Sequence, residues 1–387
     1  MVPMVNPTQP MESAAASADG SSRFGAGPTR RQRVARRVTK IVALLLTGLI
    51  VLSITGLFVA RGVHAWQDRL PGGVAEKTYV RLGGIEQYVN IRGASVDNPV
   101  VIWLHGGPGE PVSFLTTTWQ QRLVGEFTFI QWDQRGCGRT FEANPDAQVS
   151  MDLLLGDLND LVDYATQRFH QPVYVVGHSW GTALGSLYAA THAEKIAGYV
   201  GIGQLVSATQ SDNMAARAAE KAARAAGHPA DADEIAARYQ TYLNAGLGDP
   251  GFDLKSFSRF QQLTAKYLAP SGKDVTLTAL ASPDFGWADL RWQWLVMTNT
   301  SRFVAIQTPL YKELAFFVPR LMMDVPVAII QGENDYVCNT RLAQLWFDGL
   351  VAPTKNMFIM PGLGHSPMVD DPAAFADTLR QAITSLR

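Results

Sequence analysis

Short apolar segments alternate with amphipathic segments along most of the chain. Residues 99–104 and 127–132 are largely apolar, which is typical of strands buried on both faces. Apolar and polar residues alternate along residues 74–92, which predicts two strands of a hairpin that turns at Gly83-Gly84. Further strands are expected at 173–176, 197–202, 325–330 and 356–360, and helices at 153–165, 182–192, 340–350 and 372–386. Strands that alternate with helices predict an α/β fold with a doubly wound, mostly parallel sheet.

The alternation stops between residues 205 and 324. This stretch carries alanine-rich helical segments and an aromatic cluster that includes Trp292 and Trp294. Open α/β sheets bind their ligands at the carboxyl ends of the strands. We therefore expect residues 205–324 to form a helical cap over that edge, inserted between a first core segment at 74–204 and a second at 325–387.

A long apolar segment, residues 41–60, precedes these elements and is bracketed by Lys40 and Arg61. About 20 helical residues, at a rise of about 1.5 Å each, cross a hydrocarbon core of roughly 30 Å. The segment is longer than the apolar stretch of a signal peptide, so we favour a retained transmembrane helix over a protein secreted after cleavage near Ala65. Residues 1–40 lack periodicity and are expected to form a disordered, basic tail.

Charge is distributed unevenly around this apolar segment, although the net charge is −1. Six Arg and Lys residues lie between residues 30 and 40, and no acidic residue occurs between Asp19 and Asp68. Because the basic cluster adjoins an apolar segment, it indicates a lipid bilayer as partner and not a nucleic acid. Cations before the span and few after it place the rest of the chain on the non-cytoplasmic side of the membrane.

Composition and cysteine content indicate the size of the core and which disulfides, metals and cofactors to expect. With 387 residues, 47% of them hydrophobic, the chain can bury a large core. Its two cysteines, Cys137 and Cys338, are expected to be free thiols and not a disulfide. The histidines show no zinc-binding spacing, and the glycine pairs at 136–138 and 201–203 lack the third glycine of a dinucleotide fingerprint. No metal and no cofactor is therefore expected.

The segment Gly-His-Ser-Trp-Gly at residues 177–181 lies between a predicted strand and a predicted helix. A serine at such a strand-to-helix turn is held in a strained conformation that exposes its hydroxyl group. The helix that follows directs its positive end toward the place where negative charge develops during acyl transfer. We therefore predict Ser179 to be a catalytic nucleophile.

A nucleophilic serine needs a histidine base and an acid that orients the base. Asp335 and His365 each follow a predicted strand on a glycine-containing loop, so both are expected at the edge of the sheet where Ser179 lies. Glu333 is the alternative acid, but it stands directly after the turn glycine. The chain order Ser, Asp, His is that of the α/β-hydrolases, and we predict Ser179, Asp335 and His365 to form their catalytic triad.

An oxyanion hole needs two N–H donors aimed at one point. Trp180 supplies one such group immediately after the nucleophile. The segment His-Gly-Gly-Pro-Gly at residues 105–109 ends an earlier strand, and Gly107 is the expected second donor because a residue without Cβ lets a substrate approach.

Three motifs together resemble the proline iminopeptidase family: residues 105–109, the segment Asp-Gln-Arg-Gly-Cys-Gly-Arg at 133–139, and the Gly-x-Ser-Trp-Gly turn at 177–181. The resemblance implies a capped α/β-hydrolase that removes an N-terminal residue, often proline, from peptides without a metal. It also implies that Asp133 and Arg135 brace the loop beside the active site without touching the substrate.

The chain departs from this family at several positions. His178 stands where glycine is common, and Thr140 stands where serine is usual. No cap glutamate that would hold the ammonium group of the substrate can be matched by motif. Glu313 is the preferred candidate because apolar residues surround it in a helical pattern, and Trp292 and Trp294 are candidate substrate contacts.

Three functions follow, in order of preference. The first is an aminopeptidase acting on short peptides, which requires a carboxylate facing the serine. The second is an esterase or lipase for small hydrophobic esters, which requires an apolar cap pocket. The third is a non-catalytic binding protein, which would normally have lost a triad residue or a motif glycine.

Overall fold

The computed structural model describes residues 29–67, 69–115, 117–246, 249, 251–268, 275–298, 308–310, 312–314 and 317–387. Residues 1–28 of the predicted tail lie outside this range. The chain divides into two units, Met1–Gly56 and Leu57–Arg387, and the second contains the whole sheet.

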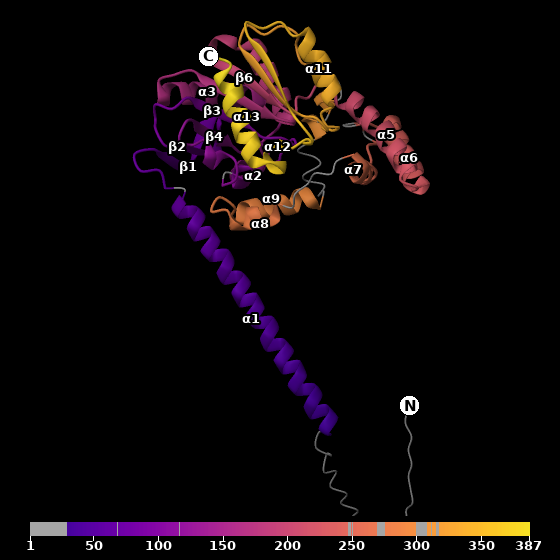
Figure 1. Cartoon of the computed structure of the whole chain (residues 1–387). Helices are drawn as coiled ribbons and strands as arrows, with labels where there is room; N and C mark the ends of the chain where they lie inside the picture. Colours follow the sequence, from indigo (N-terminus) through magenta and orange to yellow (C-terminus); the bar gives the residue numbers. More distant parts are fainter. Residues whose placement is uncertain are drawn as a thin grey trace, which may run out of the picture. The chain divides into compact units, whose positions relative to one another are not determined.

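One sheet of eight strands organises the larger unit, and the strands follow the order β1-β2-β4-β3-β5-β6-β7-β8 (Figure 1). The strands are β1 (Val74–Leu82), β2 (Ile85–Gly93), β3 (Val100–Leu104), β4 (Thr128–Trp132), β5 (Val173–His178), β6 (Ile196–Ile202), β7 (Val327–Gly332) and β8 (Lys355–Met360). The hairpin β1–β2 is antiparallel and pairs antiparallel with β4, whereas all other neighbours are parallel. The predicted mostly parallel sheet and its hairpin are confirmed.

Apolar layers cover both faces of the sheet. Along β3, Ile102 belongs to the layer formed with α3 and α4, whereas Val101 and Trp103 belong to the layer formed with α13. This double burial explains why the strand is a solid apolar segment with no polar alternation. The helices outside the insertion are α2 (Gly138–Ala143), α3 (Met151–Phe169), α4 (Trp180–Thr191), α11 (Thr340–Gly349), α12 (Pro367–Asp370) and α13 (Pro372–Thr384), with short 3-10 turns at Ser113–Leu115, Gln120–Arg122 and Ala193–Lys195.

The insertion between β6 and β7 is helical, as the broken alternation predicts. Its helices are α5 (Ala208–Ala225), α6 (Pro229–Asn244), α7 (Leu254–Leu268), α8 (Thr276–Ala281) and α9 (Trp287–Met297), and further helical residues occur at 308–310 and 312–314. Helices α5, α6 and α7 lie together (Figure 1). They share an apolar cluster of their own, which includes Ala219, Ile235 and Phe260. Helices α8 and α9 instead pack against the α/β core.

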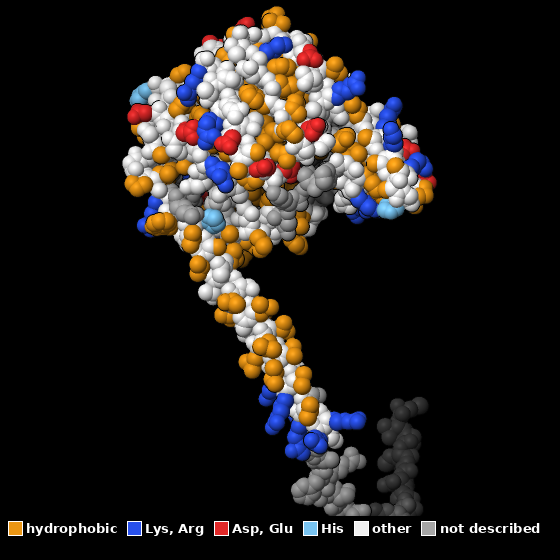
Figure 2. Space-filling model, in the orientation of Figure 1, with side chains coloured by type: hydrophobic (Ala, Val, Ile, Leu, Met, Phe, Trp, Pro, Cys, Tyr) orange, Lys and Arg blue, Asp and Glu red, His pale blue; other side chains and the backbone are white. Residues whose placement is uncertain are grey.

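Helix α1 (Arg30–Gln67) is longer than the predicted span at 41–60. Residues 30–40 are helical and not part of a disordered tail, because Arg and Lys are good helix formers and simply extend the apolar helix. Hydrophobic side chains cover the middle of α1, and Lys and Arg gather toward its N-terminal end (Figure 2). The helix is long and apolar enough to cross a membrane, a property that a signal sequence also has.

Candidate active site

Ser179 lies at a sharp turn between β5 and α4. Its backbone has φ 54° and ψ −121°, a strained conformation for a residue with a side chain. Its N–H donates to the carbonyl of Ile202 at 2.9 Å, which ties the turn to the neighbouring strand. A Cβ at Gly177 would overlap the carbonyl of Gly181, so glycine is required for this close approach. The turn therefore exposes the Ser179 hydroxyl at the carboxyl edge of the sheet.

A continuous chain of hydrogen bonds connects Ser179, His365 and Asp335. Nε2 of His365 lies 2.8 Å from Oγ of Ser179, and Nδ1 of His365 lies 2.9 Å from Oδ2 of Asp335. The three residues follow β5, β8 and β7, whose carboxyl ends meet at one edge of the sheet. Nucleophile, base and orienting acid thus have the mutual geometry that acyl transfer requires.

The Asp335 carboxylate is buried and held by three further donors. Its Oδ1 accepts from the N–H groups of Val337 and Cys338, each at 2.9 Å, and its Oδ2 accepts from Nε2 of Gln331 at 3.0 Å. Glu333, the alternative acid, is exposed and accepts from the N–H of Gly362 at 2.7 Å. Only Asp335 therefore has the contact with His365.

Opposing effects act on the pKa of His365. Burial lowers it, but the charge and hydrogen bond of Asp335, together with the charges of Glu110 and Asp370, raise the pKa above its ordinary value. The base is therefore protonated to a higher pH than a free imidazole would be. A reaction that needs neutral His365 is expected to gain rate as the pH rises through this pKa.

The two candidate oxyanion donors lie beside the serine. Trp180 is the first residue of α4, so its N–H has no acceptor within the helix. Gly107 lines the same cavity as Ser179, with φ 113°, and an added Cβ at the adjacent Gly106 would come 3.1 Å from Cβ of Ser179. These positions leave room for a substrate carbonyl only because the loop is built from glycine.

Residues 133–139 form hydrogen bonds to several segments next to the candidate site. Arg135 forms two hydrogen bonds to Asp157, at 2.7 and 2.8 Å, and a third to the carbonyl of Gly83 at 2.9 Å. Gln134 accepts from the indole N–H of Trp180 at 3.2 Å, and its own N–H donates to Nε2 of His105 at 3.3 Å. The segment thereby connects the turn at Ser179 to the loop that starts at His105.

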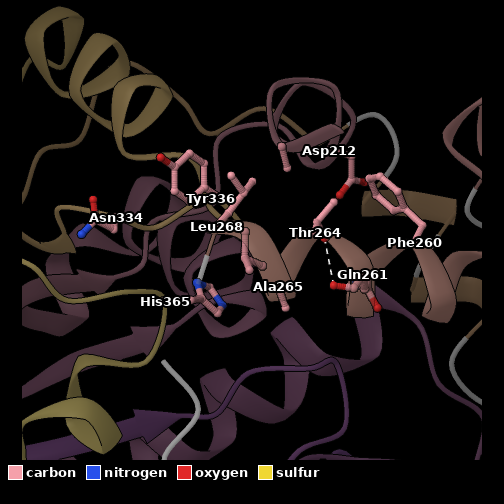
Figure 3. Close-up of a pocket in the computed structure, with 11 residues that line it drawn as sticks. Asp212, Phe260, Gln261, Thr264, Ala265, Leu268, Asn334, Tyr336 and His365 are labelled. Carbon is pink, nitrogen blue, oxygen red and sulfur yellow. Dashed lines mark hydrogen bonds between the residues drawn. The ribbon is translucent and has the colours of Figure 1, made fainter. Parts of the chain in front are cut away.

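Two cavities adjoin the serine and histidine. The first, the Ser179 cavity, has a volume of about 450 Å³ and is lined by Ser179, His365 and Glu110 together with apolar side chains such as Phe114 and Met368. The second, the cap cavity, has a volume of about 230 Å³. Figure 3 shows it with Asp212 and Phe260 from the cap and His365 from the core. Because His365, Gln261 and Val337 line both cavities, the two are neighbours.

Glu110 and Asp212 are acids that the motif analysis did not select. Glu110 is accessible from the Ser179 cavity, and desolvation by the surrounding protein raises the pKa of its carboxyl while nearby His365 lowers it. No hydrogen bond or ion pair to its carboxylate occurs among the described residues. Burial raises the pKa of Asp212 to about 7, although nearby Tyr242 acts in the opposite direction. The available signal for Glu110 was its place directly after residues 105–109.

The three residues predicted to contact substrate lie elsewhere, which corrects that expectation. Trp292 is buried, and its indole N–H donates to the carbonyl of Gly109 at 2.7 Å, so it supports the loop. Trp294 is 66% exposed. Glu313 is exposed, and its nearest partner is the N–H of Met151 at 3.5 Å. None of the three lines either cavity. Glu313 is displaced because the apolar residues around it pack into the main core and not over Ser179.

Cys137 and Cys338 are free and buried, and no disulfide joins them. Sγ of Cys137 lies 3.3 Å from Nε2 of His105, and the N–H of Cys338 donates to Asp335. Within the described residues, no group of three or more His, Cys, Asp or Glu side chains is arranged to hold a metal ion.

Comparison with known proteins agrees with this fold. Residues 101–378 match the α/β hydrolase family, so the chain belongs to that family. Among its relatives, the probable aminopeptidase YbaC of Bacillus subtilis (strain 168) is 26% identical, over 77% of this chain and 93% of that protein. A proline iminopeptidase of Saccharolobus solfataricus is 23% identical, over 80% of this chain and 92% of that protein. The resemblance to proline iminopeptidases therefore extends over most of the chain.

Solved structures show the same fold. A membrane phospholipase A superposes with a TM-score of 0.58 at 16% identity, covering 91% of this chain and 99% of that one. A proline iminopeptidase-related protein from Thermus thermophilus superposes with a TM-score of 0.51 at 21% identity, covering 81% of this chain and 98% of that one. At these identities the likeness concerns the fold, and the activity has to be argued from the site.

Proposed function

We propose that the protein is a serine hydrolase that works through an acyl-enzyme, and the hydrogen-bonded chain Ser179–His365–Asp335 carries this proposal. His365 accepts the hydroxyl proton while Oγ of Ser179 attacks the substrate carbonyl. The N–H groups of Trp180 and Gly107 stabilise the oxyanion. His365 then donates the proton to the leaving group, and water hydrolyses the acyl-enzyme by the same route in reverse.

Within this class, we propose an aminopeptidase that acts on short peptides. Burying a substrate ammonium group without a negative partner costs several kcal/mol. Glu110 offers that partner in the cavity that contains Ser179, and its carboxylate forms no hydrogen bond or ion pair with the described residues. The relationship to proteins named aminopeptidase and proline iminopeptidase supports the same substrate class.

An ester of a hydrophobic acid is the second candidate. Its support is the apolar wall of the Ser179 cavity, which includes Phe114, Leu115 and Met368. Such a wall would receive an acyl chain as readily as the ring of an N-terminal proline. The two candidates differ in whether a positive charge on the substrate promotes the reaction.

Aminoacyl-p-nitroanilides and p-nitrophenyl esters, assayed with the purified full-length protein, distinguish these candidates. An aminopeptidase is expected to hydrolyse prolyl- or alanyl-p-nitroanilide and to lose this activity when the amine is acetylated. Faster hydrolysis of the acetylated compounds, together with high activity on p-nitrophenyl butyrate, would favour the esterase.

Replacement of Glu110 by glutamine is expected to raise KM for free-amine substrates about 10- to 100-fold, because a charge-assisted hydrogen bond contributes about 1.5–3 kcal/mol. KM for simple esters should stay close to that of the wild type. The matched control is Glu313→Gln, which removes an exposed acid that lines neither cavity. If Asp212→Asn produces the selective loss and Glu110→Gln does not, the ammonium site lies in the cap cavity instead.

We also propose that residues 41–60 of α1 anchor the protein in a membrane with the catalytic unit on the non-cytoplasmic side. The exposed apolar surface of α1 and the basic residues before it support this placement. A secreted form cleaved near Ala65 is the alternative.

The full chain is expected to stay in the membrane fraction after carbonate extraction, and its catalytic unit should be digested by protease added from the non-cytoplasmic side. Digestion only from the cytoplasmic side would contradict the orientation.

A further inference from the structure

Helix α9 is apolar on two opposite faces. Its inner face places Trp292, Leu295 and Val296 against Cys137 and Phe141 of the core. Its outer face carries a stripe at intervals of three and four residues, and these side chains remain exposed: Trp287 (77%), Leu290 (46%), Trp294 (66%) and Met297 (77%). An apolar face of a helix is normally covered by protein or by lipid. The outer stripe therefore has no apolar partner among the residues that the structure describes.

Helix α8, which precedes α9 in the chain, also carries an exposed apolar side chain. Ala279 packs inward against Phe114 and Leu115, whereas Leu277 is 75% exposed. We call Leu277, Trp287, Leu290, Trp294 and Met297 the outer apolar face. Hydrophobic side chains appear on the surface in Figure 2 where α8 and α9 lie in Figure 1. At its edge, Arg291 is paired with Glu142 at 2.6 Å, so the face has a polar rim.

The end of the apolar helix contacts the segment that carries this face. Arg61 is the first charged residue after residues 41–60. Its guanidinium donates to the carbonyls of Leu280 and Phe285, each at 2.9 Å, and these carbonyls flank the connection between α8 and α9. A charged residue that ends a transmembrane segment lies at the level of the lipid headgroups. The contact therefore brings the α8–α9 connection to that same level.

We propose that the outer apolar face inserts into the interfacial region of the bilayer that anchors α1, an inference that rests on the membrane anchor proposed above. Tryptophan is the side chain that membrane–water interfaces favour, and two of the five residues are tryptophan. The anchor already holds the domain near the lipid, so docking of the face is effectively intramolecular and loses little further translational freedom. These two arguments select lipid over a second copy of the chain as the occupant.

Tryptophan fluorescence can test the docking, because the nine tryptophans divide cleanly by exposure. Trp66, Trp287 and Trp294 are exposed, and the other six are buried. The full chain would be placed in nanodiscs of phosphatidylcholine brominated near the headgroup end of its acyl chains, and its fluorescence compared with that in unbrominated nanodiscs. In the wild type, quenching is expected at all three exposed positions.

Phenylalanine substitutions assign the quenched signal while they keep the surface apolar. The double variant Trp287→Phe/Trp294→Phe is expected to lose most of the quenchable intensity, and Trp66→Phe to lose the remainder. Trp346→Phe, which removes a buried tryptophan, is the matched control and should leave the quenchable intensity unchanged.

The outcomes separate the docking from the anchor. Quenching that disappears in Trp66→Phe but is unchanged in the double variant would overturn the docking of the face and leave the anchor in place. Absence of any quenching in the wild type would overturn the docking, whereas the anchor is tested separately by carbonate extraction. Quenching carried by Trp287 and Trp294 supports the docking.

Discussion

Replacing Ser179 or His365 by alanine is expected to lower kcat by about 10⁶-fold, the loss seen when triad residues that act as a unit are removed. The serine supplies the attacking oxygen, and the histidine 2.8 Å away is positioned to accept its proton. Without either, the only remaining catalysis is that of the oxyanion donors and of substrate binding. Steady-state kinetics on the best substrate of the panel measure the loss.

Covalent labelling identifies the nucleophile independently of the substrate. A fluorophosphonate probe should label the wild type and fail to label Ser179→Ala. The matched control is Ser186→Ala, which removes a buried serine of α4 whose hydroxyl bonds to the carbonyl of Ala183, and this variant should still be labelled. Labelling that persists in Ser179→Ala would assign the nucleophile to another residue.

Replacing Asp335 by asparagine is expected to lower kcat by about 10⁴-fold, whereas Glu333→Gln should stay within a few-fold of the wild type. An asparagine amide facing Nδ1 of His365 would favour the tautomer with its proton on Nε2. That nitrogen could then no longer accept the proton of Ser179. The N–H groups of Val337 and Cys338 would keep an oxygen acceptor, so the loop should remain folded.

The pH profile provides a second readout of the same substitution. The charge and hydrogen bond of Asp335 raise the pKa of His365, so their loss lowers it. Because the base must be neutral, the acidic limb of kcat/KM is expected to move to lower pH in Asp335→Asn while its plateau falls. Equal losses in Asp335→Asn and Glu333→Gln, with no movement of this limb, would contradict the assignment of Asp335.

Local features were readable from the sequence because their signals depend on neighbours along the chain. The segment around Ile102 is apolar at successive positions because both faces of the sheet are covered, and the pattern records this burial directly. The turn at Ser179 needs glycines where backbones approach closely, and the need is visible as glycine at 177 and 181. Strands, helices and the candidate triad follow from such signals.

In the cap, the local sequence pattern did not identify the residues that lie near Ser179. The pattern around Glu313 indicates that one side of its helix is buried, and Leu310, Leu314 and Phe317 are indeed buried. They pack into the main core and not over the cavity, so Glu313 is left outside the site. An amphipathic pattern shows that a face has an apolar partner, but it does not show which partner.

Glu110 is the opposite case, because it lines the cavity of Ser179 and was not among the predicted site residues. Its place directly after residues 105–109 puts it close to the predicted oxyanion donor, but the local pattern does not separate an acid that enters a cavity from one that faces solvent. It joins Ser179 only because the loop after β3 lines the same cavity as Ser179, Gln261 and Gln293. Local spacing and chain order were enough to predict the helices and strands, the turn at Ser179 and the candidate triad. Which acids and aromatic residues surround the serine depends on the tertiary structure, because the cavity is lined by segments that lie far apart in the chain.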